Sequence, residues 1–178
     1  MKRLLPALGV FAALFVACSP KYIKDCSAVP GFDFKRSYKI AVLTPYVSGG
    51  SEAFAQRMQD HAIGRVSEAR KLLPVNKFQI REIENAMGMG MSYQPSPSTA
   101  IEIARQLGAD LAMITEIGLQ PVAGDKIAPL YCSVSIVDVA TGSQVYSGSG
   151  RTANPVSKEA AGEWLIDLAT DCLIKGFK

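Results

Sequence analysis

The 178-residue chain is poor in the residues that catalytic and metal sites usually require. It contains one histidine, His61, and its four cysteines form neither a CxxC pair nor a Cys/His spacing. We therefore expect no zinc site, no histidine-based metal cage and no redox dithiol. A Ser-His nucleophile would have to use His61, so we predict no catalytic residues, no enzyme activity and no cofactor.

The chain also lacks a large excess of positive or negative charge. Nineteen Lys and Arg residues stand against 16 Asp and Glu, a net charge of +3, and no basic cluster interleaved with aromatics occurs. This composition gives no support for nucleic-acid binding. Gly49-Gly50-Ser51 lacks the further glycines or the Lys of a phosphate-binding loop, so we interpret it as a turn followed by a helix N-cap.

The N-terminal apolar run is too short to cross a bilayer, which needs about 20 residues. It extends from Leu4 to Ala17, follows two cations and ends in small residues before Cys18. This is the layout of an export signal. We predict a signal peptide over residues 1–17. An ordinary secretory signal with an incidental cysteine is the alternative.

The same segment resembles the bacterial lipoprotein signal. The match rests on Val16-Ala17-Cys18, with Phe15 in place of the usual Leu. The resemblance implies lipidation of Cys18, and Ser19 after it implies the outer membrane, facing the periplasm. We therefore predict a lipidated tether over residues 18–37 and one periplasmic domain over residues 38–178.

The remaining cysteines are Cys26, Cys132 and Cys172. An exported protein meets an oxidising compartment, where paired cysteines tend to form disulfides. Cys132 on a predicted strand and Cys172 on a predicted helix both occur in apolar phase, which makes a Cys132–Cys172 disulfide one interpretation. Buried free thiols are the other, and Cys26 could reach either partner.

Apolar periodicity predicts an α/β (α+β) fold in the order βαβαβββα. We expect a single mixed sheet of about five strands, with three helices packed mainly on one face. The predicted strands cover residues 38–44, 78–84, 111–119, 129–139 and 144–151, and the helices cover residues 52–73, 98–107 and a C-terminal stretch through 172.

Three segments carry a resemblance to a known family: Tyr38–Pro45, Thr99–Ile117 and Val134–Gly142. They show a strand ending in Pro, a helix followed by Leu-Gly-Ala-Asp and an apolar strand, and a strand ending in Asp-Val-x-Thr-Gly. This order resembles periplasmic lipoprotein domains such as the curli secretion channel lipoprotein, the lipoprotein activators of penicillin-binding proteins and the N-terminal domain of TolB. The resemblance implies a non-enzymatic binding or assembly module whose partners are envelope proteins or further copies of itself.

A methionine-rich segment is the remaining candidate site. Met87, Met89 and Met91 alternate with glycine, and Tyr93 follows. Methionine suits adaptable binding surfaces, so we interpret this segment as a partner-binding loop. Because thioethers also bind Cu(I), an envelope protein that binds copper or a small molecule through Met87–Met91 is the alternative function.

Overall fold

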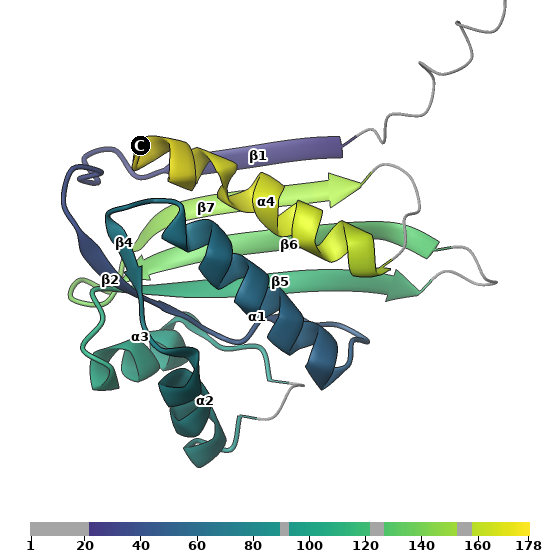
Figure 1. Cartoon of the computed structure of the whole chain (residues 1–178), viewed down its shortest axis with the longest axis horizontal. Coiled ribbons are helices and arrows are strands. Elements are labelled where there is room, and N and C mark those ends of the chain that lie inside the picture. Colours follow the sequence, from purple (N-terminus) through teal and green to yellow (C-terminus); the bar gives the residue numbers. More distant parts are fainter. Residues whose placement is uncertain (1–21, 90–92, 122–126, 153–157) are drawn as a thin grey trace, which may run out of the picture.

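The computed structural model describes residues 22–89, 93–121, 127–152 and 158–178. These residues form one mixed seven-stranded sheet and four helices (Figure 1). The strand order is β1-β7-β6-β5-β2-β4, and β3 also pairs with β5. In chain order the elements are β1 (Tyr22–Ala28), β2 (Tyr38–Val42), β3 (Tyr46–Val47), α1 (Glu52–Ser67), β4 (Leu72–Pro74), α2 (Lys77–Ala86), α3 (Pro97–Gln106), β5 (Leu111–Pro121), β6 (Ile127–Asp138), β7 (Gln144–Thr152) and α4 (Lys158–Gly176).

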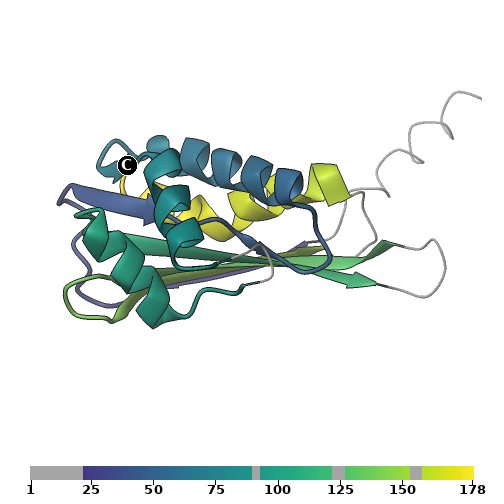
Figure 2. The same cartoon turned by 90° about the horizontal axis from the view of Figure 1, so that it is seen from below.

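Helices cover both faces of the sheet. Helices α1 and α4 lie side by side on one face, over a core that includes Ile40, Met113 and Ile136 (Figures 1 and 2). Helix α3 packs on the opposite face with α2 beside it, over a smaller core that includes Leu43 and Ile103. The prediction of a mixed α+β sheet is confirmed, but the expectation of five strands and three helices mainly on one face is wrong.

Helix α1 begins where the sequence predicts and ends earlier. The Ser51 side chain accepts a hydrogen bond from the backbone N–H of Phe54 at 3.2 Å, which caps the helix. Its buried stripe includes Met58, Ala62 and Val66, as the apolar spacing indicates. The helix stops at Ser67, and the residues predicted as its last turn form the edge strand β4, parallel to β2.

Helix α2 replaces the strand predicted at residues 78–84. Asn76 caps it by accepting a hydrogen bond from Phe78 N at 2.9 Å. Ile80 and Glu84, one helical turn apart, are its buried residues, whereas Phe78 is 65 % exposed. A strand in which Ile80 and Glu84 face inward would also turn Phe78 and Glu82 inward. Because both of these are exposed, the helical period accounts for the burial and a period of two does not.

The segment predicted as a tether contributes the outermost strand of the sheet. Strand β1 pairs with β7 in antiparallel register, from Tyr22 opposite Thr152 to Ala28 opposite Tyr146. Residues 22–28, inside the segment predicted as a tether, are therefore part of the sheet. The segment after β1 packs Phe32 and Phe34 against Phe177 at the end of α4.

The disulfide joins a different pair of cysteines from the predicted one. Cys26 of β1 is bonded to Cys172 of α4, with their Cα atoms 6.4 Å apart. Cys132 is a free thiol that is fully buried under α4. Cys132 and Cys172 both face the core as predicted, but the pairing prediction is wrong because β1 brings Cys26 alongside the last helix.

Candidate functional surfaces

A cavity of about 320 Å³ lies at the carboxyl end of β2. Its position follows from the chain topology. After β2 the chain passes to α1 on one face, and after the neighbouring parallel strand β4 it passes to α2 and α3 on the other. Diverging connections of this kind open a crevice at the strand ends, where α/β sheets commonly bind ligands. The lining residues are Thr44, Pro45, Glu52, Gln56, Arg81, Glu84, Asn85, Met89, Tyr93 and Pro95.

Glu84 is the buried acid of this cavity. It is 6 % exposed, and its carboxylate accepts hydrogen bonds from Thr44 N at 3.0 Å and from Thr44 Oγ1 at 2.7 Å. Burial raises the pKa of Glu84 above its ordinary value, and the Thr44 hydrogen bonds and the charge of Arg81 oppose that rise. The two oxygens are thus fixed in place by Thr44, two residues beyond the end of β2.

Arg81 lies one turn before Glu84 on α2. Its Nε and Nη2 donate to Gln59 Oε1 at 3.1 and 3.0 Å. Gln59 is fully buried and donates in turn to the carbonyl oxygen of Val42 at 2.9 Å. A buried amide on α1 therefore orients the guanidinium at the cavity wall.

The predicted methionine loop divides between two environments. Met87 is 42 % exposed at the end of α2, whereas Met89 packs partly against the smaller core and lines the cavity. Tyr93 lines the same cavity, and its hydroxyl lies 3.2 Å from Thr99 Oγ1. Met91 lies outside the described residues.

The sheet face opposite α4 carries a second candidate surface, which we call the open face. Cross-strand neighbours on β1, β7 and β6 form three rows there. The rows are Ser27–Ser147–Ser135, then Asp25–Ser149–Ser133, then Ile23–Arg151–Tyr131. Most of these side chains are small and polar, and an exposed Ile23 lies at the margin of the surface.

Glu116 of β5 extends the middle row of the open face, opposite Ser133. The Tyr131 hydroxyl donates to Glu116 Oε1 at 2.7 Å, and Gln94 donates to Oε2 at 2.9 Å. The Tyr131 ring lies over Gly118, where a Cβ would overlap it. The hydrogen bond to Glu116, followed by burial, raises the pKa of Tyr131 to about 12. The hydroxyl is therefore a fixed donor at neutral pH.

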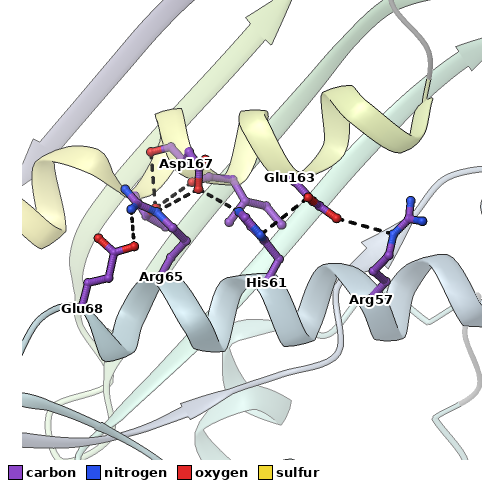
Figure 3. A network of polar contacts seen from close by, with 8 residues as sticks. Arg57, His61, Arg65, Glu68, Glu163 and Asp167 are labelled. Atoms are coloured by element: carbon purple, nitrogen blue, oxygen red, sulfur yellow. Dashed lines mark hydrogen bonds and ion pairs between the residues drawn. The ribbon is translucent and has the colours of Figure 1, made fainter.

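A polar network joins α1 to α4 on the outer side of the helix layer (Figure 3). Asp167 Oδ1 lies 2.8 Å from both His61 Nε2 and Arg65 Nε. Glu163 approaches Arg57 Nε at 3.7 Å and His61 Nδ1 at 3.9 Å. The single histidine thus lies between two carboxylates of α4 as part of a helix contact.

Strand β1 is held to α4 by charge as well as by the disulfide. Asp171 forms ion pairs with Lys24 of β1 and with Lys175 one turn further along α4. The hydrogen bonds from Lys175 and Lys24 lower the pKa of Asp171 to about 2.

Within the described ranges, no group of three His, Cys, Asp or Glu residues could hold a metal ion, and no helix is long and apolar enough to span a membrane.

The fold belongs to a structural class seen in other solved proteins, although no family model and no curated protein sequence matches the chain. The PelC dodecamer from Paraburkholderia phytofirmans aligns with a TM-score of 0.55 and 12 % identity, over 86 % of this chain and 97 % of the PelC chain. Escherichia coli LpoB in solution aligns with a TM-score of 0.55 and 18 % identity, over 67 % of this chain and 58 % of LpoB. The E. coli LpoB C-terminal domain aligns with a TM-score of 0.51 and 20 % identity, over 73 % of this chain and 88 % of that domain.

At these identities the likeness establishes a shared fold. The expected resemblance to envelope lipoprotein domains is supported at the level of the fold alone. Predicted lipidation of Cys18 concerns a residue outside the described part of the chain, so it stays a prediction. Sequence reasoning missed the cavity charges Arg81 and Glu84, although their spacing of three residues would have placed them on one helix face.

Proposed function

We propose that this chain is an outer-membrane lipoprotein, anchored through Cys18 and facing the periplasm, that acts as a non-enzymatic assembly module of an envelope complex. The open face is the observation that carries the proposal. Nothing in the described part of the chain covers its three rows on β1, β7 and β6, whereas helices cover the other face. The shared fold with PelC, which forms a dodecamer, supports assembly through copies of the same chain.

The anchor would hold the open face close to the membrane. Four residue steps separate Cys18 from Tyr22, where β1 begins. At about 3.3 Å per extended residue the anchor allows roughly 13 Å. The first strand, and with it the edge of the open face, would therefore stay beside the lipid surface, which favours partners in or on the same membrane.

Photo-crosslinking in cells tests the assembly surface. A photoreactive amino acid at Ser149, in the middle row of the open face, should give a discrete crosslinked species. Ser67, exposed at the end of α1, serves as the matched control and should give none. A Ser149→Arg variant should lose the assembled species while keeping the wild-type thermal midpoint, because the added side chain projects from an exposed strand position. Equal crosslinking at both positions, or none at Ser149, would contradict the proposal.

The copper alternative has a separate test. Met87 is exposed while Met89 is partly packed, so the described part of the loop does not present two thioethers in one environment. Titration with Cu(I) of the wild type and of a triple Leu variant at Met87, Met89 and Met91 distinguishes the functions. Stoichiometric binding that the triple variant loses would support the copper role in place of assembly.

A further inference from the structure

Three charged side chains at the β2 cavity have no ion-pair partner among the described residues: Arg81, Glu84 and Glu52. Two other cations, on α2 and α3, differ. Lys77 pairs with Asp60, and Arg105 pairs with Glu102. The two signs therefore line a shared space without forming a direct ion pair, which is costly for a group as buried as Glu84.

Neutral groups hold these charges in place. Gln59 positions the Arg81 guanidinium, and both hydrogen-bond donors of Thr44 fix the Glu84 carboxylate. Glu52 lies in the exposed first turn of α1, where Gln56 Nε2 donates to its Oε1 at 2.9 Å. The arrangement is therefore set before any ligand arrives, which lowers the entropy cost of binding.

The volume and the remaining walls limit the ligand to a small molecule. About 320 Å³ is at the lower end of the range for ligand sites. Pro45, Met89 and Pro95 supply apolar surface to the cavity wall. A simple anion would face two carboxylates here, and a simple cation would face the guanidinium. A molecule that carries one positive and one negative group can place each beside the opposite charge and avoid both repulsions.

We propose that this cavity binds a free α-amino acid, with its ammonium group at Glu84 and Glu52 and its carboxylate at Arg81. The side chain of the amino acid lies against Pro45, Met89 and Pro95. An ammonium beside Glu84 compensates the burial that raises the pKa of this carboxyl. No residue of the three rows of the open face lines this cavity, so ligand binding and assembly can be measured independently.

Calorimetric titration of the chain, purified in detergent, with each of the twenty L-amino acids tests the proposal. At least one should bind with a stoichiometry of one per chain. Its N-acetyl derivative, which lacks the ammonium, and its methyl ester, which lacks the carboxylate, should each bind at least tenfold more weakly. These two compounds test charge recognition on the unaltered protein, whatever the stability of any variant.

Two isosteric variants locate the site. Arg81→Gln and Glu84→Gln should each weaken binding at least tenfold, because each removes one of the complementary charges. Arg105→Gln, which removes an exposed cation of α3 paired only with Glu102, should bind as wild type. Absence of binding by every amino acid at millimolar concentration, equal binding of the blocked derivatives, or preferential binding of dipeptides would each overturn the proposal. Loss of binding with an unchanged crosslink at Ser149 would leave the assembly function standing.

Discussion

Asp167 on α4 lies 2.8 Å from His61 on α1 and an equal distance from Arg65, one turn further along the same helix (Figure 3). Arg65 Nε is buried, and its N–H does not point at the carboxylate with hydrogen-bond geometry, so that contact is ionic. The relationship joins two helices that are far apart in sequence and cover the same sheet face. It adds a polar contact between α1 and α4 to their apolar packing.

The ion pair across these helices should couple more strongly than an ordinary surface pair. In a double-mutant cycle of Arg65→Gln and Asp167→Asn, we expect a coupling free energy of about 1 kcal/mol. The exposed pair of Arg105 and Glu102 on α3 is the control, with about 0.3 kcal/mol expected. Unfolding should be measured in urea, because guanidinium chloride is a salt and would screen the ion pairs. Equal coupling in both cycles would mean that the network does not join the helices.

Gly148 permits the close approach of α4 to β7. A Cβ at this position would overlap the carbonyl oxygen of Ala169, which also accepts a hydrogen bond from the Tyr146 hydroxyl at 2.6 Å. Gly148→Ala should therefore lower the free energy of unfolding by about 2 kcal/mol or more, because backbone must move. Gly64→Ala is the control: it adds a methyl group in open space on the exposed side of α1 and should raise stability by about 0.5–1 kcal/mol. A neutral Gly148→Ala would place α4 further from the sheet.

The disulfide between Cys26 and Cys172 spans 146 residues of sequence. Closing a loop of that length stabilises the fold by about 5 kcal/mol in the chain-entropy model, and measured effects are commonly smaller. Cys26→Ser should therefore lower the free energy of unfolding by about 2–5 kcal/mol. Added reductant should destabilise the wild type and leave the variant unchanged. A reductant effect of equal size in both proteins would place the stabilising bond elsewhere.

Acid should remove the contribution of Asp171. Its pKa is lowered to about 2 by hydrogen bonds from Lys175 and Lys24, so the folded state favours the ionised form. The stabilisation is complete above the ordinary pKa of 3.8 and is lost as the pH falls towards 2. At pH 7, Asp171→Asn should cost about 1 kcal/mol, allowing for solvent screening. The difference between variant and wild type should vanish near pH 2 in urea unfolding, and a difference independent of pH would exclude this ion pair as its source.

The predicted anchor has its own test in cells. Cys18→Ala removes the thiol that lipidation requires, so the variant should be soluble in the periplasm or remain unprocessed. Stable anchoring takes about two membrane signals, which the acyl chains on Cys18 would supply alone. Fractionation followed by immunoblotting measures the distribution, with Cys132→Ala as a control that should stay in the membrane fraction. Outer-membrane fractionation of Cys18→Ala as in wild type would remove the basis for the anchor.

Sequence patterns correctly predicted those helices and strands whose signals lie within a short stretch of the chain. The cap at Ser51, the buried run that forms β5 and the alternation along β6 are each visible within a dozen residues of sequence. The sequence pattern predicts a strand in place of α2 because apolar and polar residues alternate over Phe78–Arg81, although this alternation does not continue through Ile83. The cap at Asn76 was the available signal for a helix.

Long-range partners account for the other errors. Strand β1 exposes the large apolar side chain of Ile23, and its existence depends on pairing with β7, whose partner residues lie 118 to 130 positions later. The pairing of Cys26 with Cys172 depends on that strand. Likewise, the burial of Glu84 depends on Thr44, 40 positions earlier, which no local pattern of charge could indicate.

The link between β1 and α4 also has a mechanical consequence. If the chain is tethered at Cys18, any pull between membrane and domain is applied to the start of β1. Only the residues from Tyr22 to Cys26 could peel from β7 before the load reaches the disulfide. Beyond that point the force passes through a covalent bond into α4, whose packing against β7 and α1 resists it as a body. The domain would therefore withstand tension at its edge strand without unzipping the sheet.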